Sequence, residues 1–141
     1  MTTVKEQINE VVDELRYGHP ETRKAAAIKL GRIRDLAVIP FLIEAIKKDN
    51  YSFTRVAAIQ SLGWIANPLA IDAFIYAIEN DKEDLVRKTA ITTLGSFRDK
   101  KGIMCLEKVV NNGAESNAIR NAASLAIEVI NGTTPNYSQA K

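Results

Sequence analysis

The sequence of 141 residues contains one cysteine and one histidine. One cysteine cannot form an intramolecular disulfide or a site with several thiolate ligands, and it is typical of a reducing compartment. A single histidine, His19, excludes a di-iron centre that needs several His–Glu pairs. Any Ser-His-Asp or Cys-His nucleophile system would also have to use this one residue. Because His19 precedes Pro20 at an expected helix boundary, we interpret it as a cap or surface residue.

The sequence also lacks long apolar runs, a large net charge and nucleotide-binding motifs. No run could form a signal-peptide core or span a bilayer, so we expect a soluble, cytoplasmic protein without a membrane partner. The 19 Lys and Arg residues against 17 Asp and Glu give a formal charge of +2, which is too little to indicate nucleic acid. Phosphate loops, nucleotide fingerprints and Asp-rich metal loops are missing, and no carboxylate pair is singled out for acid–base work. These absences predict a protein that is not an enzyme and holds no cofactor.

A nine-residue segment recurs at a fixed period. Residues 55–63 read RVAAIQSLG; the segment 32 residues earlier reads RKAAAIKLG, and the segment 32 residues later reads RKTAITTLG. A period of this length is typical of stacked supersecondary units, each of which covers the apolar face of its neighbour. The repeat therefore predicts a solenoid.

Apolar residues spaced by three, four and seven positions predict helices throughout the chain. In the first helix they are Val4, Ile8, Val11, Val12 and Leu15. No useful length alternates with period two. We expect an all-α, right-handed α-α solenoid of about eight helices in four antiparallel hairpins, starting half a repeat out of phase. Residues 1–131 would form its single domain and 132–141 a flexible C-terminal tail. The expected helices are 3–17, 21–33, 36–48, 52–66, 69–80, 84–97, 101–111 and 116–130.

Several residue types stand at the same place in each repeat. Gly31, Gly63 and Gly95 come late in the first helix of each pair, where we expect close packing or an unusual backbone angle. The arginines stand one repeat apart, and two aspartates lie in the loops just before the next arginine, which they are placed to hydrogen-bond. We interpret these residues as a structural ladder rather than a ligand site: Arg23, Arg55, Arg87, Asp49 and Asp81.

The repeats resemble a known family. The unit R-x-x-A-[IA]-x-x-L-G-x-[IF]-x-[DN], followed by an apolar second helix, is similar to the HEAT repeat, and more narrowly to the short HEAT-like repeat of the phycobilisome lyase family. The resemblance covers residues 20–112 well. It implies an α-solenoid; members include bilin lyase subunits, phycobilisome-degradation factors, a di-iron hydroxylase and many scaffolds. The final helix departs from the pattern, because Ile127-Glu128 replaces the Leu-Gly pair.

The resemblance also implies that the second helix of each pair lines the concave surface, where solenoids usually bind partners. Positions off the buried stripe of these helices differ between repeats, as a partner-specific surface would, although solvated drift would look similar. Trp64 joins them because other repeats have Arg32 and Ser96 at its position. For Trp64 and Tyr76, interface and local packing stay open as alternatives. The candidate partner-binding residues are Phe41, Glu44, Lys48, Trp64, Asp72, Tyr76, Met104 and Lys108.

These patterns lead to two functional hypotheses and a weaker third. The first is a non-catalytic scaffold or adaptor that binds another protein. The alternative, implied only by the resemblance, is a bilin lyase subunit or phycobilisome-associated factor that holds a pigment protein or tetrapyrrole, and a spectral titration with free bilin separates the two. Nucleic-acid binding through basic residues at helix ends is the third, and the near-neutral charge argues against it. Cys105 lies next to an apolar stripe and is expected to be a packed, inert thiol.

Overall fold

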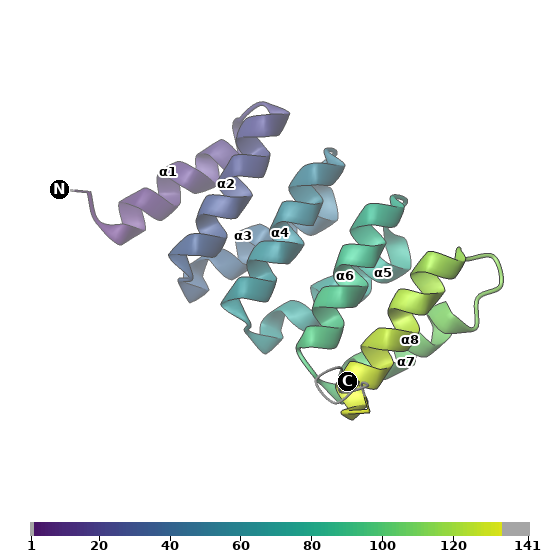
Figure 1. Ribbon diagram of the computed structural model, residues 1–141. Helices are drawn as coiled ribbons and strands as arrows, with labels where there is room; N and C mark the ends of the chain where they lie inside the picture. The colour runs from purple at the N-terminus through teal and green to yellow at the C-terminus, as the bar shows by residue number, and fades with distance from the viewer. Residues whose placement is uncertain (1, 134–141) are drawn as a thin grey trace, which may run out of the picture.

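The computed structural model describes residues 2–133 and shows an all-helical chain over that range (Figure 1). The predicted α-solenoid of helical hairpins is confirmed. The predicted tail, residues 132–141, lies outside the described residues from position 134 onward. The helices are α1 (Val4–Tyr17), α2 (Pro20–Ile33), α3 (Ile39–Lys48), α4 (Ser52–Ile65), α5 (Ile71–Asn80), α6 (Asp84–Ser96), α7 (Ile103–Val110) and α8 (Asn117–Asn131), with 3₁₀ turns at Leu36–Val38, Pro68–Ala70 and Lys100–Gly102.

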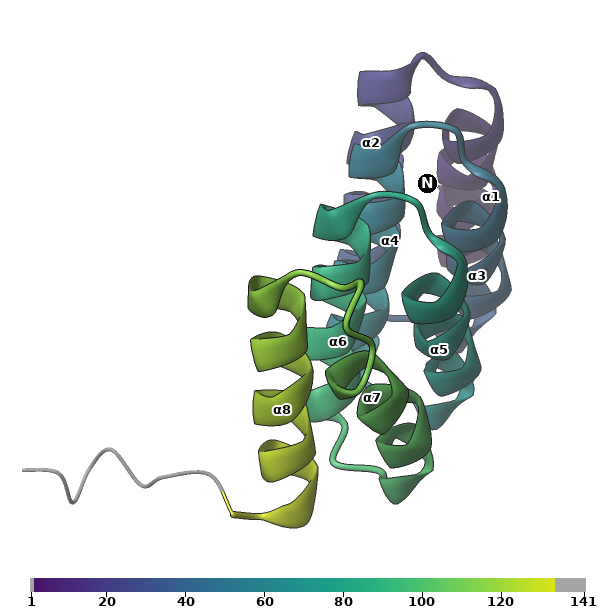
Figure 2. The ribbon, with the colours of Figure 1, turned by 90° about the vertical axis from the view of Figure 1, so that its right-hand side faces the viewer.

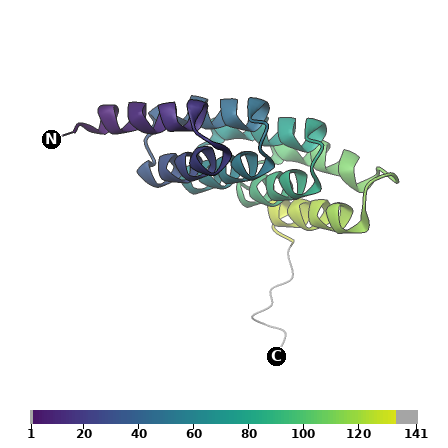
Figure 3. The same cartoon turned by 90° about the horizontal axis from the view of Figure 1, so that it is seen from above.

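The helices form two layers. Helices α2, α4, α6 and α8 lie side by side in one layer, and α1, α3, α5 and α7 form the other (Figures 2 and 3). Each hairpin therefore places one helix in each layer, and successive hairpins repeat the arrangement along the stack.

The second helix of each pair starts later than the sequence predicts, because one 3₁₀ turn precedes it. At three equivalent positions a side-chain oxygen accepts from the backbone N–H two residues on, as in the 2.9 Å bond from Ala37 N to Asp35 Oδ1. Such a bond is typical of Asp and Asn at the start of a turn. In each case the residue before this Asp or Asn has a left-handed backbone conformation, although none of the three is glycine. The left-handed residues are Arg34, Ala66 and Arg98, with φ of 57°, 56° and 54°.

The core lies between the two layers. Alanine pairs on α2 and α4 and larger residues such as Leu42 and Phe74 are fully or almost fully buried. The ring of Phe74 meets Phe97 edge-on at 5.2 Å between centroids. One prediction for the core was wrong: Val4, placed on the buried stripe of the first helix, is 55% exposed. It stands at the first position of α1, where little of the stack covers it.

Helix backbones approach one another closely within the layer of α2, α4, α6 and α8. A Cβ added at Gly31 would lie 2.9 Å from Ser61 Cα, and one at Gly95 would lie 3.1 Å from Ala126 Cα. The Ser61 hydroxyl donates a buried 2.7 Å hydrogen bond to the Ala27 carbonyl across the α2–α4 contact. The close-packing interpretation of the glycine positions thus applies to Gly31 and Gly95, whose backbone angles are helical.

The other layer is more widely spaced, since α3, α5 and α7 contact one another at few residues. A stack whose one layer is tighter must bend toward that layer, and Figure 2 shows the bend toward the side of α2, α4, α6 and α8. The predicted assignment of the second helices to the concave surface was therefore wrong. The candidates on α3, α5 and α7 lie on the convex layer, and the first helices of the pairs line the concave one.

Candidate partner-binding surfaces and the arginine ladder

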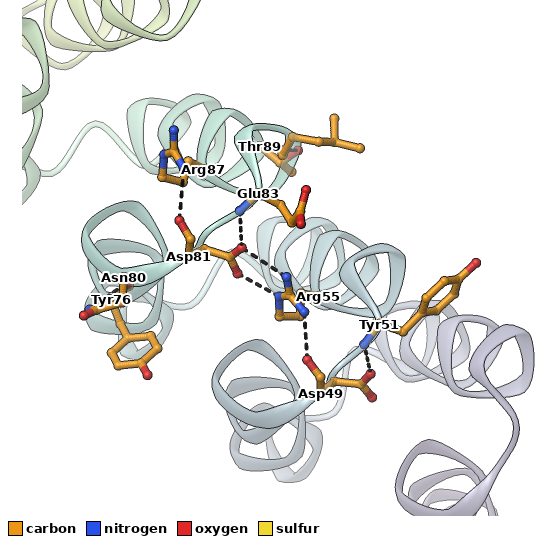
Figure 4. A network of polar contacts seen from close by, with 10 residues as sticks. Asp49, Tyr51, Arg55, Tyr76, Asn80, Asp81, Glu83, Arg87 and Thr89 are labelled. Carbon is orange, nitrogen blue, oxygen red and sulfur yellow. Dashed lines mark hydrogen bonds and ion pairs between the residues drawn. The ribbon is translucent and has the colours of Figure 1, made fainter. Parts of the chain in front are cut away.

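The guanidinium of Arg55 joins two loops of the stack (Figure 4). Its Nε and Nη2 donate to the two carboxylate oxygens of Asp81 at 2.7 and 3.1 Å, and Nη1 donates to the Asp49 carbonyl at 2.9 Å. Arg55 is only 7% exposed. Paired N–H···O bonds from a planar guanidinium to a carboxylate are strong and geometrically specific. This contact therefore fixes one repeat relative to the next.

The preceding link has the same geometry. Arg23 donates from Nε and Nη2 to the Asp49 carboxylate at 3.0 and 3.3 Å, and from Nη1 to the Gly18 carbonyl at 2.9 Å. Each aspartate thus gives its carboxylate to the arginine of the preceding repeat and only its backbone carbonyl to the arginine that follows. The sequence placed the aspartates beside the following arginine but did not show this division of their two acceptors.

The third link is incomplete. Arg87 Nη1 donates to the Asp81 carbonyl at 3.1 Å, and Nη2 reaches Glu115 at 2.7 Å, while Nε is buried without a hydrogen-bond partner. The reason is in the sequence: Gly113 stands one period after Asp81. Glu115, from the loop before α8, supplies one contact in place of two. The Nε of Arg120 on α8 is likewise buried without a partner.

The three candidates on α3 line a groove between α3 and α1. Phe41, Glu44 and Lys48 border a space of about 600 Å³ between α1 and α3. The guanidinium of Arg16 lies 3.3 Å from the Glu44 carboxylate and 5.1 Å from the centre of the Phe41 ring. Phe41 and Glu44 are therefore engaged by α1, which leaves Lys48 as the exposed charge at that end of the groove.

The remaining convex candidates do not converge on one site. Asp72 pairs with Lys101 at 2.8 Å, and this contact raises the pKa of the exposed Lys101 ammonium. Tyr76 is 39% exposed and carries the Lys47 ammonium 5.2 Å from its ring centre. Lys108 borders a different groove, between α5 and α7, and Met104 is 70% exposed outside it.

Trp64 lies apart from these candidates, on the concave layer. Its side chain is 44% exposed, and with Arg32 and Arg34 it lines a hollow of about 340 Å³ where α2 and α4 end. The sequence interpretation missed three further apolar side chains of the concave layer. Two of them, Phe53 and Leu85, could have been found from the sequence, because each stands two residues before a ladder arginine at the start of a helix. These three are Phe53, Leu85 and Leu125, exposed by 46, 50 and 49%.

Cys105 is buried at 8% exposure on α7. Burial, with a smaller effect of Glu79, raises the pKa of its thiol to about 11. The thiolate is the reactive form, so at pH 8 only a very small fraction of Cys105 is nucleophilic. We expect a thiol reagent to modify the native protein about 100-fold more slowly than the urea-unfolded chain. Equal rates in the two states, measured by absorbance, would show that the thiol is accessible.

Several groups that matter for catalysis are isolated. Over residues 2–133, no three or more His, Cys, Asp or Glu side chains are grouped as a metal ion would need. His19 is exposed at the N-terminal end of α2 and its side chain makes no capping hydrogen bond. No helix in this part of the chain is long and apolar enough to cross a membrane.

Comparison with known proteins places the repeats in a family. The family model for HEAT repeats matches residues 8–87, more than half of the chain. This match does not distinguish the phycobilisome lyase subtype from other HEAT repeats. No curated protein matches the sequence significantly. The period, the hairpin stack and this match agree, and the chain belongs to the HEAT-repeat family.

Proposed function

We propose that the protein is a non-catalytic scaffold that binds another protein on its concave layer. HEAT repeats generally serve as protein-interaction scaffolds. The observation that carries the proposal is the exposure of large apolar side chains on that layer: Phe53, Trp64, Leu85 and Leu125 are each close to half exposed. Exposed apolar surface of this kind commonly marks protein interfaces, and Trp in particular is enriched among the residues that dominate their energy.

The tryptophan and tyrosine candidates test the proposal because they lie on opposite layers. Trp64→Ala is expected to leave the melting temperature nearly unchanged, since its ring is almost half exposed. We expect it to weaken the partner complex by about tenfold or more, as truncation of an interface tryptophan typically does. Tyr76→Ala tests the convex layer in the same way, with a side chain that is 39% exposed.

The experiment captures proteins from lysate of the native cells with wild-type and variant chains as bait, identifies them by mass spectrometry, and repeats binding with the purified partner. Weaker binding by the Trp64 variant alone supports the concave layer. Weaker binding by the Tyr76 variant alone would transfer the site to the convex candidates. A large drop in melting temperature for Trp64→Ala would show that its ring belongs to the core.

The alternative role, with a pigment protein or tetrapyrrole, has gained no support beyond the resemblance of the repeats. A free bilin that shows no saturable spectral shift with the protein removes it.

A further inference from the structure

An apolar groove runs along the concave layer between α6 and α8. It measures about 560 Å³, and its lining is dominated by small and aliphatic side chains, including Thr92, Ala122, Leu125 and Val129. The floor is close to the backbone because Gly95 packs against Ala126. Among the described residues that line the groove, only Lys88 is charged. The groove has room for a bulky apolar side chain of a partner, with a cation at its edge.

Two other exposed apolar side chains of this layer, Phe53 and Trp64, also have cations beside them. The Lys24 ammonium lies 5.7 Å from the centre of the Phe53 ring. Arg32 and Trp64 share one hollow. Among the described residues, no carboxylate lies within salt-bridge distance of Lys24, Arg32 or Lys88, since the ion pairs of the structure involve other cations.

Most acidic groups near this layer are engaged or turned away. Glu21 accepts a hydrogen bond from the Tyr51 hydroxyl, and Asp84 pairs with Arg87. Asp35 and Asp99 accept backbone hydrogen bonds in the turns before α3 and α7. Glu128 stands at the repeat position of Gly95, the residue that faces the next helix, and so it lies toward the end of the stack. Glu83, at the N-cap of α6, is exposed and takes part in no ion pair of the described residues. Lys24, Arg32 and Lys88 outnumber it, so the net charge presented to a partner is positive.

We propose that the concave layer binds an extended acidic segment of the partner protein, whose bulky apolar side chains enter the α6–α8 groove and cover Phe53 and Trp64. Its carboxylates meet Lys24, Arg32 and Lys88. This inference rests on the proposed scaffold function and adds the chemistry of the partner. Neighbouring helix axes lie about 9 Å apart, so crossing from α2 to α8 takes about 27 Å, or some eight to ten extended residues.

A nucleic acid would also be attracted by cations, but the arrangement fits it less well. The three cations are separated by apolar side chains, whereas phosphate binding uses clustered Lys and Arg. The groove of about 560 Å³ between α6 and α8 is apolar rather than basic. A protein segment that combines carboxylates with apolar anchors satisfies both features.

Synthetic peptides test the inference with the full chain. Two probes of about ten residues, the length of the proposed segment, carry the same Leu and Phe anchors, separated by Glu in one and by Lys in the other. A third probe keeps Glu and replaces the anchors with Ala. Binding is followed by the fluorescence of Trp64, the single tryptophan of the chain, and by calorimetry. We expect the Glu probe to bind about tenfold or more tightly than either of the others, and added salt to weaken it.

Variants locate the site. The double change Lys24→Glu and Lys88→Glu is expected to weaken the Glu probe about tenfold, and Leu125→Ser to weaken it comparably. All three positions are at the surface, and circular dichroism checks that the helices persist. Matched controls are Lys82→Glu, an exposed lysine that lines a hollow together with Tyr76, and Leu69→Ser, at 70% exposure in the turn before α5. Neither control is expected to change binding.

Equal binding of the Glu and Lys probes, or no effect of the concave variants, would overturn the inference. Tighter binding of a single-stranded oligonucleotide than of the Glu probe would also overturn it. If lysate capture yields a partner that depends on Trp64 but no probe binds, the acidic-segment inference fails and the scaffold function stands. If neither a partner nor a probe binds, both fail.

Discussion

Replacing Asp81 with alanine is expected to destabilise the fold by about 3–5 kcal/mol, which is the usual cost of leaving one partner of a buried ion pair alone. The Asp81 carboxylate is 6% exposed and receives two hydrogen bonds from Arg55, itself 8% exposed in its side chain. Its loss leaves a buried guanidinium without a counter-charge. It also removes the acceptor for the Glu83 N–H, at 3.0 Å. Urea unfolding followed by circular dichroism measures the change.

A matched control separates the ladder from ion pairs in general. Asp72→Ala breaks the 2.8 Å contact with Lys101, where both side chains are more than half exposed, and we expect a much smaller cost, because exposed ion pairs contribute little to stability. Asp81→Asn, which keeps one acceptor, should fall between the two. If Asp81→Ala costs no more than Asp72→Ala, the ladder does not hold the repeats together.

Gly31→Ala is expected to destabilise the protein by about 2 kcal/mol even though alanine favours helices. The new Cβ would overlap Ser61 Oγ and lie 2.9 Å from Ser61 Cα, so α2 and α4 would have to separate. That separation strains the hydrogen bond from Ser61 to the Ala27 carbonyl. Thermal unfolding measures the effect.

Two variants make the interpretation of Gly31→Ala specific. Gly63→Ala meets a single atom, the Thr93 Cγ2 methyl at 3.0 Å, and no backbone atom of the next helix. Its cost should be well below that of Gly31→Ala, because the gain in helix propensity offsets part of this one contact. Adding Ser61→Gly to Gly31→Ala removes two of the three close atoms and should recover part of the lost stability, a coupling that a double-mutant cycle measures. Additive costs would show that the two residues do not share one contact.

Much of the fold could be predicted from the sequence because each repeat carries its own helix signals. The period locates equivalent residues, and Asp35, Asn67 and Asp99 mark the turns before the second helices. The curvature could not be predicted, because it depends on contacts between repeats. Gly31 against Ser61 brings two first helices together, and no single repeat displays that pairing. The assignment of the second helices to the concave surface came from the family resemblance, and the structure places the first helices there.

One residue of the candidate surface could be singled out from the sequence for the same reason. Trp64 was noticed because it interrupts the pattern of its own repeat position, and it does lie on the concave layer. Leu125 carried no such signal: it stands on the final helix, whose sequence departs from the repeat, and its exposure is set by the groove beside α6. The division of Asp49 between two arginines was also hidden, because sequence distance favours the following arginine while the carboxylate faces the preceding one.

The arginine–aspartate contacts all lie at one edge of the stack, at the loops that lead from a second helix into the next first helix. Short charged contacts fix the spacing of the repeats at that edge, whereas over residues 2–133 no buried ion pair joins the turns at the opposite edge. Bending of the stack should therefore separate the helix ends at the opposite edge and leave the spacing at the arginine edge unchanged. The concave surface would then open and close mainly at the side away from the arginines.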